Sequence, residues 1–105
     1  MAIKKITIYW RDIPSQILIQ RGRIRKKRML THRFQEAIDR AAMRAGKGSS
    51  NAYISEWKRE SEKYDSDIPP KDIEEILTQE ILSIEARYSD NDLLNLVRNH
   101  GKTKD

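Results

Sequence analysis

The spacing of apolar residues changes within the first half of the chain, and this change limits the fold class. Over residues 3–10 the side chains alternate, with Ile6, Ile8 and Trp10 on one side, which is typical of a β-strand. Over residues 31–45 apolar side chains instead recur at helical spacing. A chain of 105 residues is of ordinary single-domain size, and the two patterns together predict a small α+β domain.

A second strand is expected from about Gln16, after a turn over residues 12–15 in which Pro14 fixes its own φ. The two strands would pair as an antiparallel hairpin. Two interpretations of the second strand remain open. If it runs straight to Arg25, three arginines follow one another on one face; if Gly22 forms a bulge, the faces swap there. We favour the straight strand.

The helix over residues 31–45 has Thr31 as its expected N-cap, and Gly46 is expected to end it. Residues 52–57 are aromatic and suit a short third strand. The charged residues 58–67 form either an extension of that strand at an exposed edge or a solvated loop.

Two further helices are expected, one over residues 70–88 with an apolar stripe and a short one over residues 93–99. Ser89 begins a spacing that resembles a capping box. We therefore predict a small antiparallel sheet of about three strands covered by helices on one face, in the order strand, strand, helix, strand, helix, helix. Residues 1–101 would form this single domain and residues 102–105 a disordered tail.

Charge is distributed unevenly along the chain. In total there are 21 Lys and Arg residues and 16 Asp and Glu residues, a net charge of +5. Residues 1–50 hold 13 of the basic and 3 of the acidic residues, whereas residues 51–105 hold 8 and 13. The folded chain is therefore expected to have a basic side, which attracts anions, and an acidic side, which repels them.

The densest positive charge lies in residues 21–33, which contain seven Lys and Arg residues, no carboxylate and the start of the predicted helix. Cationic side chains and the free N–H groups of a helix N-terminus both favour an anion. The candidate anion-binding residues are Arg21, Arg23, Arg25, Lys26, Lys27, Arg28, His32 and Arg33. The alternative is a solvated strand edge, since Lys and Arg also protect sheet edges from aggregation.

This basic run predicts an anionic partner, either a protein or a phosphate-bearing molecule. Nucleic acid is an alternative that fits the pI of about 9.6, but aromatic residues are not interleaved with the run as base stacking requires. Trp10, Arg11 and Trp57 are candidate anchors for a partner, because a half-buried indole can wall a pocket and stack on a guanidinium. The apolar faces of the two C-terminal helices leave a homodimer open as well.

The sequence offers little for catalysis. It has no cysteine, which excludes disulfides, thiolate metal sites and cysteine nucleophiles. The two histidines are far apart in the sequence, and we expect no metal, no cofactor and no catalytic set. A small enzyme that uses His32, at the start of the predicted helix, is the second alternative.

Targeting signals are not visible in the sequence. The N-terminal residues lack the apolar stretch of a signal peptide, and no window approaches the length and hydrophobicity of a membrane span. We therefore expect a cytoplasmic location and no membrane partner.

Three stretches of the sequence resemble a known family. They are YWRDIP at residues 9–14, RFQEAIDRAAM at residues 33–43 and AYISEW at residues 52–57. They are similar, over roughly residues 3–60, to the small bacterial virulence factor domain family, which occurs as stand-alone proteins in alphaproteobacteria. The resemblance implies an accessory role beside corrinoid- and folate-linked one-carbon enzymes, next to which some members are encoded. It implies no catalytic residue, since the family name records a phenotype.

Overall fold

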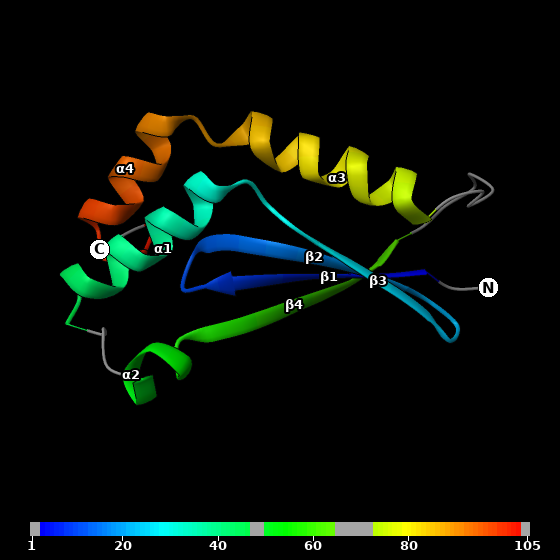
Figure 1. The fold of residues 1–105 in the computed structure, drawn as a ribbon, viewed down its shortest axis with the longest axis horizontal. Coiled ribbons are helices and arrows are strands. Elements are labelled where there is room, and N and C mark those ends of the chain that lie inside the picture. Colours follow the sequence, from blue (N-terminus) through cyan, green and yellow to red (C-terminus); the bar gives the residue numbers. More distant parts are fainter. Residues whose placement is uncertain (1–2, 47–49, 65–72, 104–105) are drawn as a thin grey trace.

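The structure is a computed structural model that describes residues 3–46, 50–64 and 73–103. Its fold is α+β, as predicted (Figure 1). In chain order the elements are β1 (Ile3–Trp10), β2 (Ile13–Arg21), β3 (Ile24–Met29), α1 (His32–Arg44), α2 (Ser50–Ile54), β4 (Trp57–Tyr64), α3 (Ile73–Arg87) and α4 (Asp90–Arg98).

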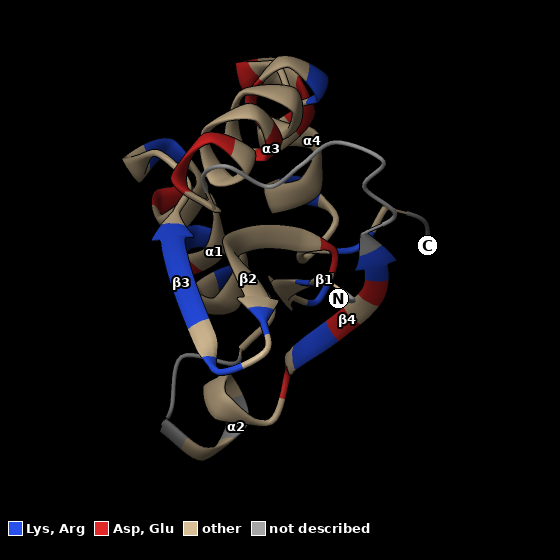
Figure 2. Cartoon of the chain, turned by 90° about the vertical axis from the view of Figure 1, so that its right-hand side faces the viewer, with Lys and Arg blue, Asp and Glu red and all other residues tan. Residues whose placement is uncertain are grey.

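Within the described residues, four antiparallel strands form one sheet in the order β3-β2-β1-β4. α3 contacts β2 and β3, and α1 contacts β2. Figure 2 shows α3 and α4 above the strands. The predicted α+β architecture, an antiparallel sheet covered by helices, is confirmed with one strand more than expected; α1, α3 and α4 lie on one side of the strands, whereas α2 lies on the other (Figure 1).

The additional strand, β3, lies inside the basic run. The prediction that the second strand continues straight to Arg25 is wrong, because β2 ends at Arg21 and β3 returns from Ile24 antiparallel to it. Gly22 adopts a φ of 59°, which costs glycine little, and the chain reverses in a two-residue turn. The bulge interpretation is wrong for the same reason.

The first turn is also tighter than predicted. Only Arg11 and Asp12 separate β1 from β2, so the turn predicted over residues 12–15 is wrong. Arg11 adopts a φ of 53° in this turn. Pro14 lies within β2 opposite Tyr9, and it is next to Ser15, the extra residue of a bulge in β2, where a sheet tolerates a residue without an N–H group.

The strand predicted over residues 52–57 is wrong as well. Residues Ser50–Ile54 form α2, and β4 begins only at Trp57. Tyr53 of α2 stacks on Trp10 with ring centroids 6.0 Å apart, so the packing of its ring overrides its strand propensity. The charged segment that follows is a strand, the first of the two predicted alternatives, as far as the structure describes it.

The longer helices lie where they were predicted. α1 begins after Thr31 and ends before Gly46, whose φ of 72° is typical of the residue after a helix. α4 begins with a capping box, in which Ser89 and Asp92 each accept a hydrogen bond from the other's backbone amide. The first residues of the predicted third helix, 70–72, lie outside the described residues.

One hydrophobic core joins the helices to one side of the sheet. Its fully buried residues include Trp10, Ile13, Ile17, Ile19, Phe34, Ile38 and Leu77. β2 contributes Ile17 and Ile19 to the side that α1 and α3 contact. Charged residues can therefore occupy the opposite side of the sheet.

The C-terminal residues close on the turn between β1 and β2. Thr103 donates its amide hydrogen to Asp12 Oδ2 at 2.8 Å, and the Lys102 carbonyl accepts from the side chain of Asn99. The first half of the tail that we predicted to be disordered is thus hydrogen-bonded to the fold. Residues 104–105 lie outside the described residues.

Candidate anion-binding face

The alternation of β3 divides the basic run between the two sides of the sheet. Lys26 and Arg28 lie opposite buried isoleucines of β2, on the side that α3 contacts. Arg25 and Lys27 point to the other side, turned away from α3, which we call the open face. β3 lies at an edge of the sheet (Figure 2). The eight predicted anion-binding residues therefore do not form a single patch.

On the α3 side, the cations are neutralised by carboxylates of α3. Glu74 forms ion pairs with Lys26, at 3.4 Å, and with Arg28. On β1, Lys5 pairs with Glu80 of α3 at 3.4 Å. These cations help to hold α3 on the sheet, and a partner would have to compete with α3 for them.

The N-terminus of α1 is occupied by a carboxylate of the same chain. Glu85 accepts hydrogen bonds from the amide and the hydroxyl of Thr31, at 2.9 and 2.8 Å, and pairs with Arg33 at 3.0 Å. Burial alone would raise the pKa of Glu85, but the Thr31 donors and the Arg33 guanidinium more than offset it and lower this pKa below its ordinary value. Arg33 also pairs with Asp90 and lies over the ring of Phe34. The chain itself supplies the anion that we expected at this helix end.

The remaining residues of the basic run are dispersed. Arg21 ends β2 on the α3 side, whereas Arg23 is exposed in the turn that follows. His32 is exposed at the first residue of α1, and none of the described hydrogen bonds and ion pairs involves it. These three side chains lie on different parts of the backbone and share no described contact.

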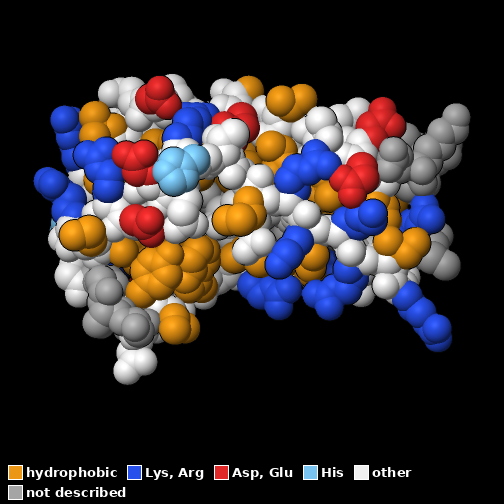
Figure 3. Space-filling model, viewed as in Figure 1, with side chains coloured by type: hydrophobic (Ala, Val, Ile, Leu, Met, Phe, Trp, Pro, Cys, Tyr) orange, Lys and Arg blue, Asp and Glu red, His pale blue; other side chains and the backbone are white. Residues whose placement is uncertain are grey.

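The open face gathers five cations from three strands. They are Lys4 of β1, Arg25 and Lys27 of β3, and Arg59 and Lys63 of β4. All five are exposed, and none forms an ion pair with another residue of the described ranges. Below the middle of the molecule in Figure 3, Lys and Arg side chains gather with no Asp or Glu side chain among them.

The acidic residues of the described strands point away from this face. Glu60 and Glu62 lie on the α3 side, where Glu62 is directly opposite Lys5 and pairs with it at 3.3 Å. The neighbouring pair of these two strands, Lys4 and Lys63, lies on the open face. The two lysines are directly opposite each other, and like charges in that position repel. The same two strands thus have paired charges on one side and unpaired positive charges on the other.

An apolar centre lies between the cations of the open face. Ile6 and Leu18 are neighbours there on β1 and β2, and they are only 6% and 8% exposed. They do not belong to the core cluster, which lies on the other side of the sheet. Lys and Arg stems can cover such residues while their charged ends remain in water. The open face therefore combines a cationic margin with an aliphatic floor.

Three members of this face, Lys4, Arg59 and Lys63, are not among the anion-binding residues predicted from the sequence. The signal lies in residues 57–64, where Glu60 and Glu62 occupy even positions and Arg59 and Lys63 odd ones. Once this segment is known to be a strand, its carboxylates and two of its cations fall on opposite sides of the sheet.

The three predicted anchors lie together at the end of the sheet where β1 turns into β2. Trp10 is fully buried and donates its indole N–H to the Tyr53 carbonyl at 2.9 Å. Arg11 lies over the Trp10 ring and donates to the His100 carbonyl. Trp57 is half-buried and packs edge-on against Tyr53. Of the two indoles, Trp57 is the one that a partner can reach.

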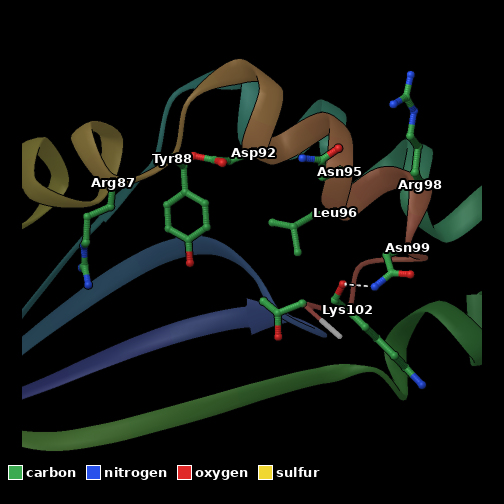
Figure 4. A pocket seen from close by; sticks show the side chains of 9 residues that line it. Arg87, Tyr88, Asp92, Asn95, Leu96, Arg98, Asn99 and Lys102 are labelled. Atoms are coloured by element: carbon green, nitrogen blue, oxygen red, sulfur yellow. Dashed lines mark hydrogen bonds between the residues drawn. The ribbon is translucent and has the colours of Figure 1, made fainter. Parts of the chain in front are cut away.

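A hollow of about 570 Å³ lies beside α4, where Tyr88 points toward the strands (Figure 4). Burial raises the pKa of the Tyr88 hydroxyl, which therefore stays protonated at neutral pH. The cations of the lining do not converge, because Arg98 points away from the hollow and Lys102 extends away from Tyr88. A small-molecule site needs polar groups that converge on the ligand, so we do not assign the anion to this hollow.

Over residues 3–46, 50–64 and 73–103, no three His, Cys, Asp or Glu side chains are placed so that they could hold a metal ion. In the same ranges, no helix combines the length and the apolar character that a membrane crossing requires.

Comparison with known proteins gives the family. The family model with the description "Virulence factor" matches residues 8–97. The match extends into α4, well beyond the residues 3–60 to which the sequence resemblance was confined. Searches of curated proteins and of solved structures found no match. Because the family model covers most of the chain, this protein belongs to the virulence factor family.

Proposed function

We propose that this chain is a non-catalytic accessory protein that binds an anionic partner, an acidic protein or a phosphate-bearing molecule, through the open face. One observation carries the proposal. Five exposed cations share a sheet face on which the described strands place no carboxylate, and none of the five has an ion-pair partner in the described ranges. Charges of one sign gathered on one face create a potential that attracts and orients anions.

The arrangement is unfavourable for the fold, which supports a role in binding. Lys4 and Lys63 face each other directly, and like charges in that position destabilise a sheet. A mixture of Glu and Lys would keep the face equally wet without repulsion, as Lys5 and Glu62 do on the α3 side. A face that only had to be solvated would not need five charges of one sign.

The family suggests where to look for the partner. We propose corrinoid- and folate-linked one-carbon enzymes, in line with the accessory role that the family resemblance implies. Nucleic acid is not our proposal, because on this side of the sheet the described strands offer a partner one reachable aromatic ring, Trp57 at the start of β4, whereas single strands stack on successive aromatic rings along a groove.

Two defined anions, polyglutamate and inorganic polyphosphate, test the proposal by isothermal titration calorimetry on the full chain. We expect binding that weakens as salt rises, and an affinity about tenfold or more lower in Arg25→Glu/Lys27→Glu. Arg40→Glu/Arg98→Glu changes the net charge equally at exposed positions of α1 and α4, and it is the matched control. Thermal unfolding establishes that each variant is folded.

Two results would contradict the proposal. If wild type and Arg25→Glu/Lys27→Glu bind both polymers equally, the open face is not the site. If the control variant loses as much affinity as the open-face variant, net charge rather than the open face is responsible.

A further inference from the structure

Each strand cation that pairs with α3 has a counterpart on the open face, one residue earlier in the chain. The counterparts are Lys4 for Lys5, Arg25 for Lys26 and Lys27 for Arg28. The members on the α3 side bind Glu74 or Glu80. The members on the open face have no ion pair within the described part of the chain. The sheet thus offers a similar set of cations to both of its sides.

The docking of α3 illustrates what such a set of cations can bind. Leu77 of α3 is fully buried in the core. Glu74 reaches the cations of β3, whereas Glu80 reaches Lys5 of β1. Six residues of an α-helix correspond to about 240° of rotation, so the two carboxylates lie on different flanks of the apolar stripe. α3 is therefore an amphipathic helix with a carboxylate on each flank.

The open face repeats the three parts of this contact across the sheet. Arg25 and Lys27 form the cationic margin on β3. The aliphatic centre includes the nearly buried Leu18 and Ile6. A partner can reach Met29 of β3, which is 57% exposed, and the half-buried Ile8 of β1 on the same side. Lys63, on β4, belongs to the far margin. Three strand spacings of about 4.8 Å separate the edge strands by about 14 Å, which accommodates a helix about 10 Å in diameter.

We propose that the open face binds an amphipathic helix of a partner protein, with its apolar stripe over Ile8, Leu18 and Met29 and carboxylates on both flanks. This inference rests on the proposed function and specifies the partner as a protein segment. Charge complementarity selects the acidic flanks. The aliphatic centre selects an apolar stripe, and the described strands offer nucleic-acid bases one reachable aromatic ring on this side, Trp57 at the start of β4.

The test uses a peptide with the α3 sequence, IEEILTQEILSIEAR, and a scrambled peptide of the same composition. Each is titrated into the isotope-labelled full chain and followed by amide chemical shifts. We expect the signals of Ile6, Leu18 and Lys27 to shift, with about tenfold weaker binding in Arg25→Glu/Lys27→Glu and less than about twofold change in Arg40→Glu/Arg98→Glu. The scrambled peptide should bind at least about fivefold more weakly, because its carboxylates no longer flank an apolar stripe.

The alternative outcomes separate this inference from the proposed function. Equal binding of both peptides at the open face would overturn the inference and leave the proposed function, since charge alone would then suffice. Tighter binding of duplex RNA than of the peptide would overturn it in favour of nucleic acid.

Shifts confined to Lys5 and Lys26 would overturn the inference too, because the peptide would then be displacing α3. If the open-face signals shift when only the concentration of the protein is raised, a second copy of this chain occupies the open face, and the inference is overturned. If peptide, polyglutamate and polyphosphate all fail to bind, the proposed function itself is contradicted.

Discussion

Glu85 joins parts of the chain that are far apart in the sequence. Its carboxylate accepts from Thr31, which precedes α1, and pairs with Arg33 in the first turn of α1. Burial disfavours the charged carboxyl, but four hydrogen bonds from Thr31 and Arg33 outweigh it, so the pKa of Glu85 lies below the ordinary value of 4.5. One side chain of the acidic half thereby fills the anion position that the basic half creates.

We predict that Glu85→Gln lowers the free energy of unfolding by about 2 kcal/mol at neutral pH, because hydrogen bonds to a charged acceptor are lost. The folded-state pKa is depressed, so this contribution is complete above about pH 5 and is lost as the pH falls through the folded-state pKa. The difference between wild type and variant should therefore shrink on acidification, as urea unfolding can measure. Glu75→Gln, on the exposed side of α3, is the control. A difference that is independent of pH would rule out this role for Glu85.

Among the elements, β3 has two kinds of residue: those on the α3 side stabilise the fold, and those on the open face are the ones that we propose bind a partner. Its residues alternate between carboxylates of α3 and the open face, so neighbours in the sequence have different tasks. Arg28 pairs with Glu74 and donates to Thr78, whereas Lys27 has no described ion pair. Substitutions at these two adjacent positions are therefore expected to have opposite consequences.

Arg28→Ala should lower the free energy of unfolding by about 1 kcal/mol, an amount that solvent screening limits because the side chain is 37% exposed. Lys27→Ala should change it by less than about 0.5 kcal/mol. For binding of polyglutamate the order reverses, with the larger loss in Lys27→Ala. Chemical denaturation and calorimetry on both variants measure this, and an equal stability loss in the two would contradict the division of β3.

The elements differ in how well the sequence predicts them. α1 and α4 carry regular apolar spacing and clear end signals at Gly46 and Ser89, so local rules suffice. β3 was missed because Gly22 fits a straight strand, a bulge or a turn, and only its pairing with β2 decides among them. The residues around Tyr53 favour a strand by local propensity, and the contact of Tyr53 with Trp10 cannot be read from the local sequence. The open face could not be predicted before β3 and β4 were known as strands.

At the scale of the whole molecule, the C-terminal residues seal the far end of the sheet. A Cβ atom on Gly101 would lie 2.9 Å from Cζ3 of the fully buried Trp10 ring, and Gly101 has a φ of 88°. Gly46 also has a positive φ, of 72°, but has nothing within 4 Å of such an atom. The two glycines differ chiefly in this contact and form a matched pair.

Gly101→Ala should lower the free energy of unfolding by about 3 kcal/mol, since backbone strain and a clash with an immobile ring add together. Gly46→Ala should cost only about 1 kcal/mol, for the strain alone. Urea unfolding followed by tryptophan fluorescence measures both values. Equal losses of unfolding free energy in the two variants would mean that the close contact between Gly101 and the Trp10 ring does not contribute to stability.

The strand order also has a consequence for how the chain reaches its native state. β1 lies between β2, which follows it directly, and β4, which begins only at Trp57. The β1–β2–β3 meander can assemble early from near neighbours, whereas pairing with β4 must wait for a long loop to close. During that interval the outer edge of β1 is an unsatisfied template that another nascent copy can pair with. We expect refolding at high concentration to lose material to intermolecular β-pairing, and a chaperone that shields this edge to restore the yield.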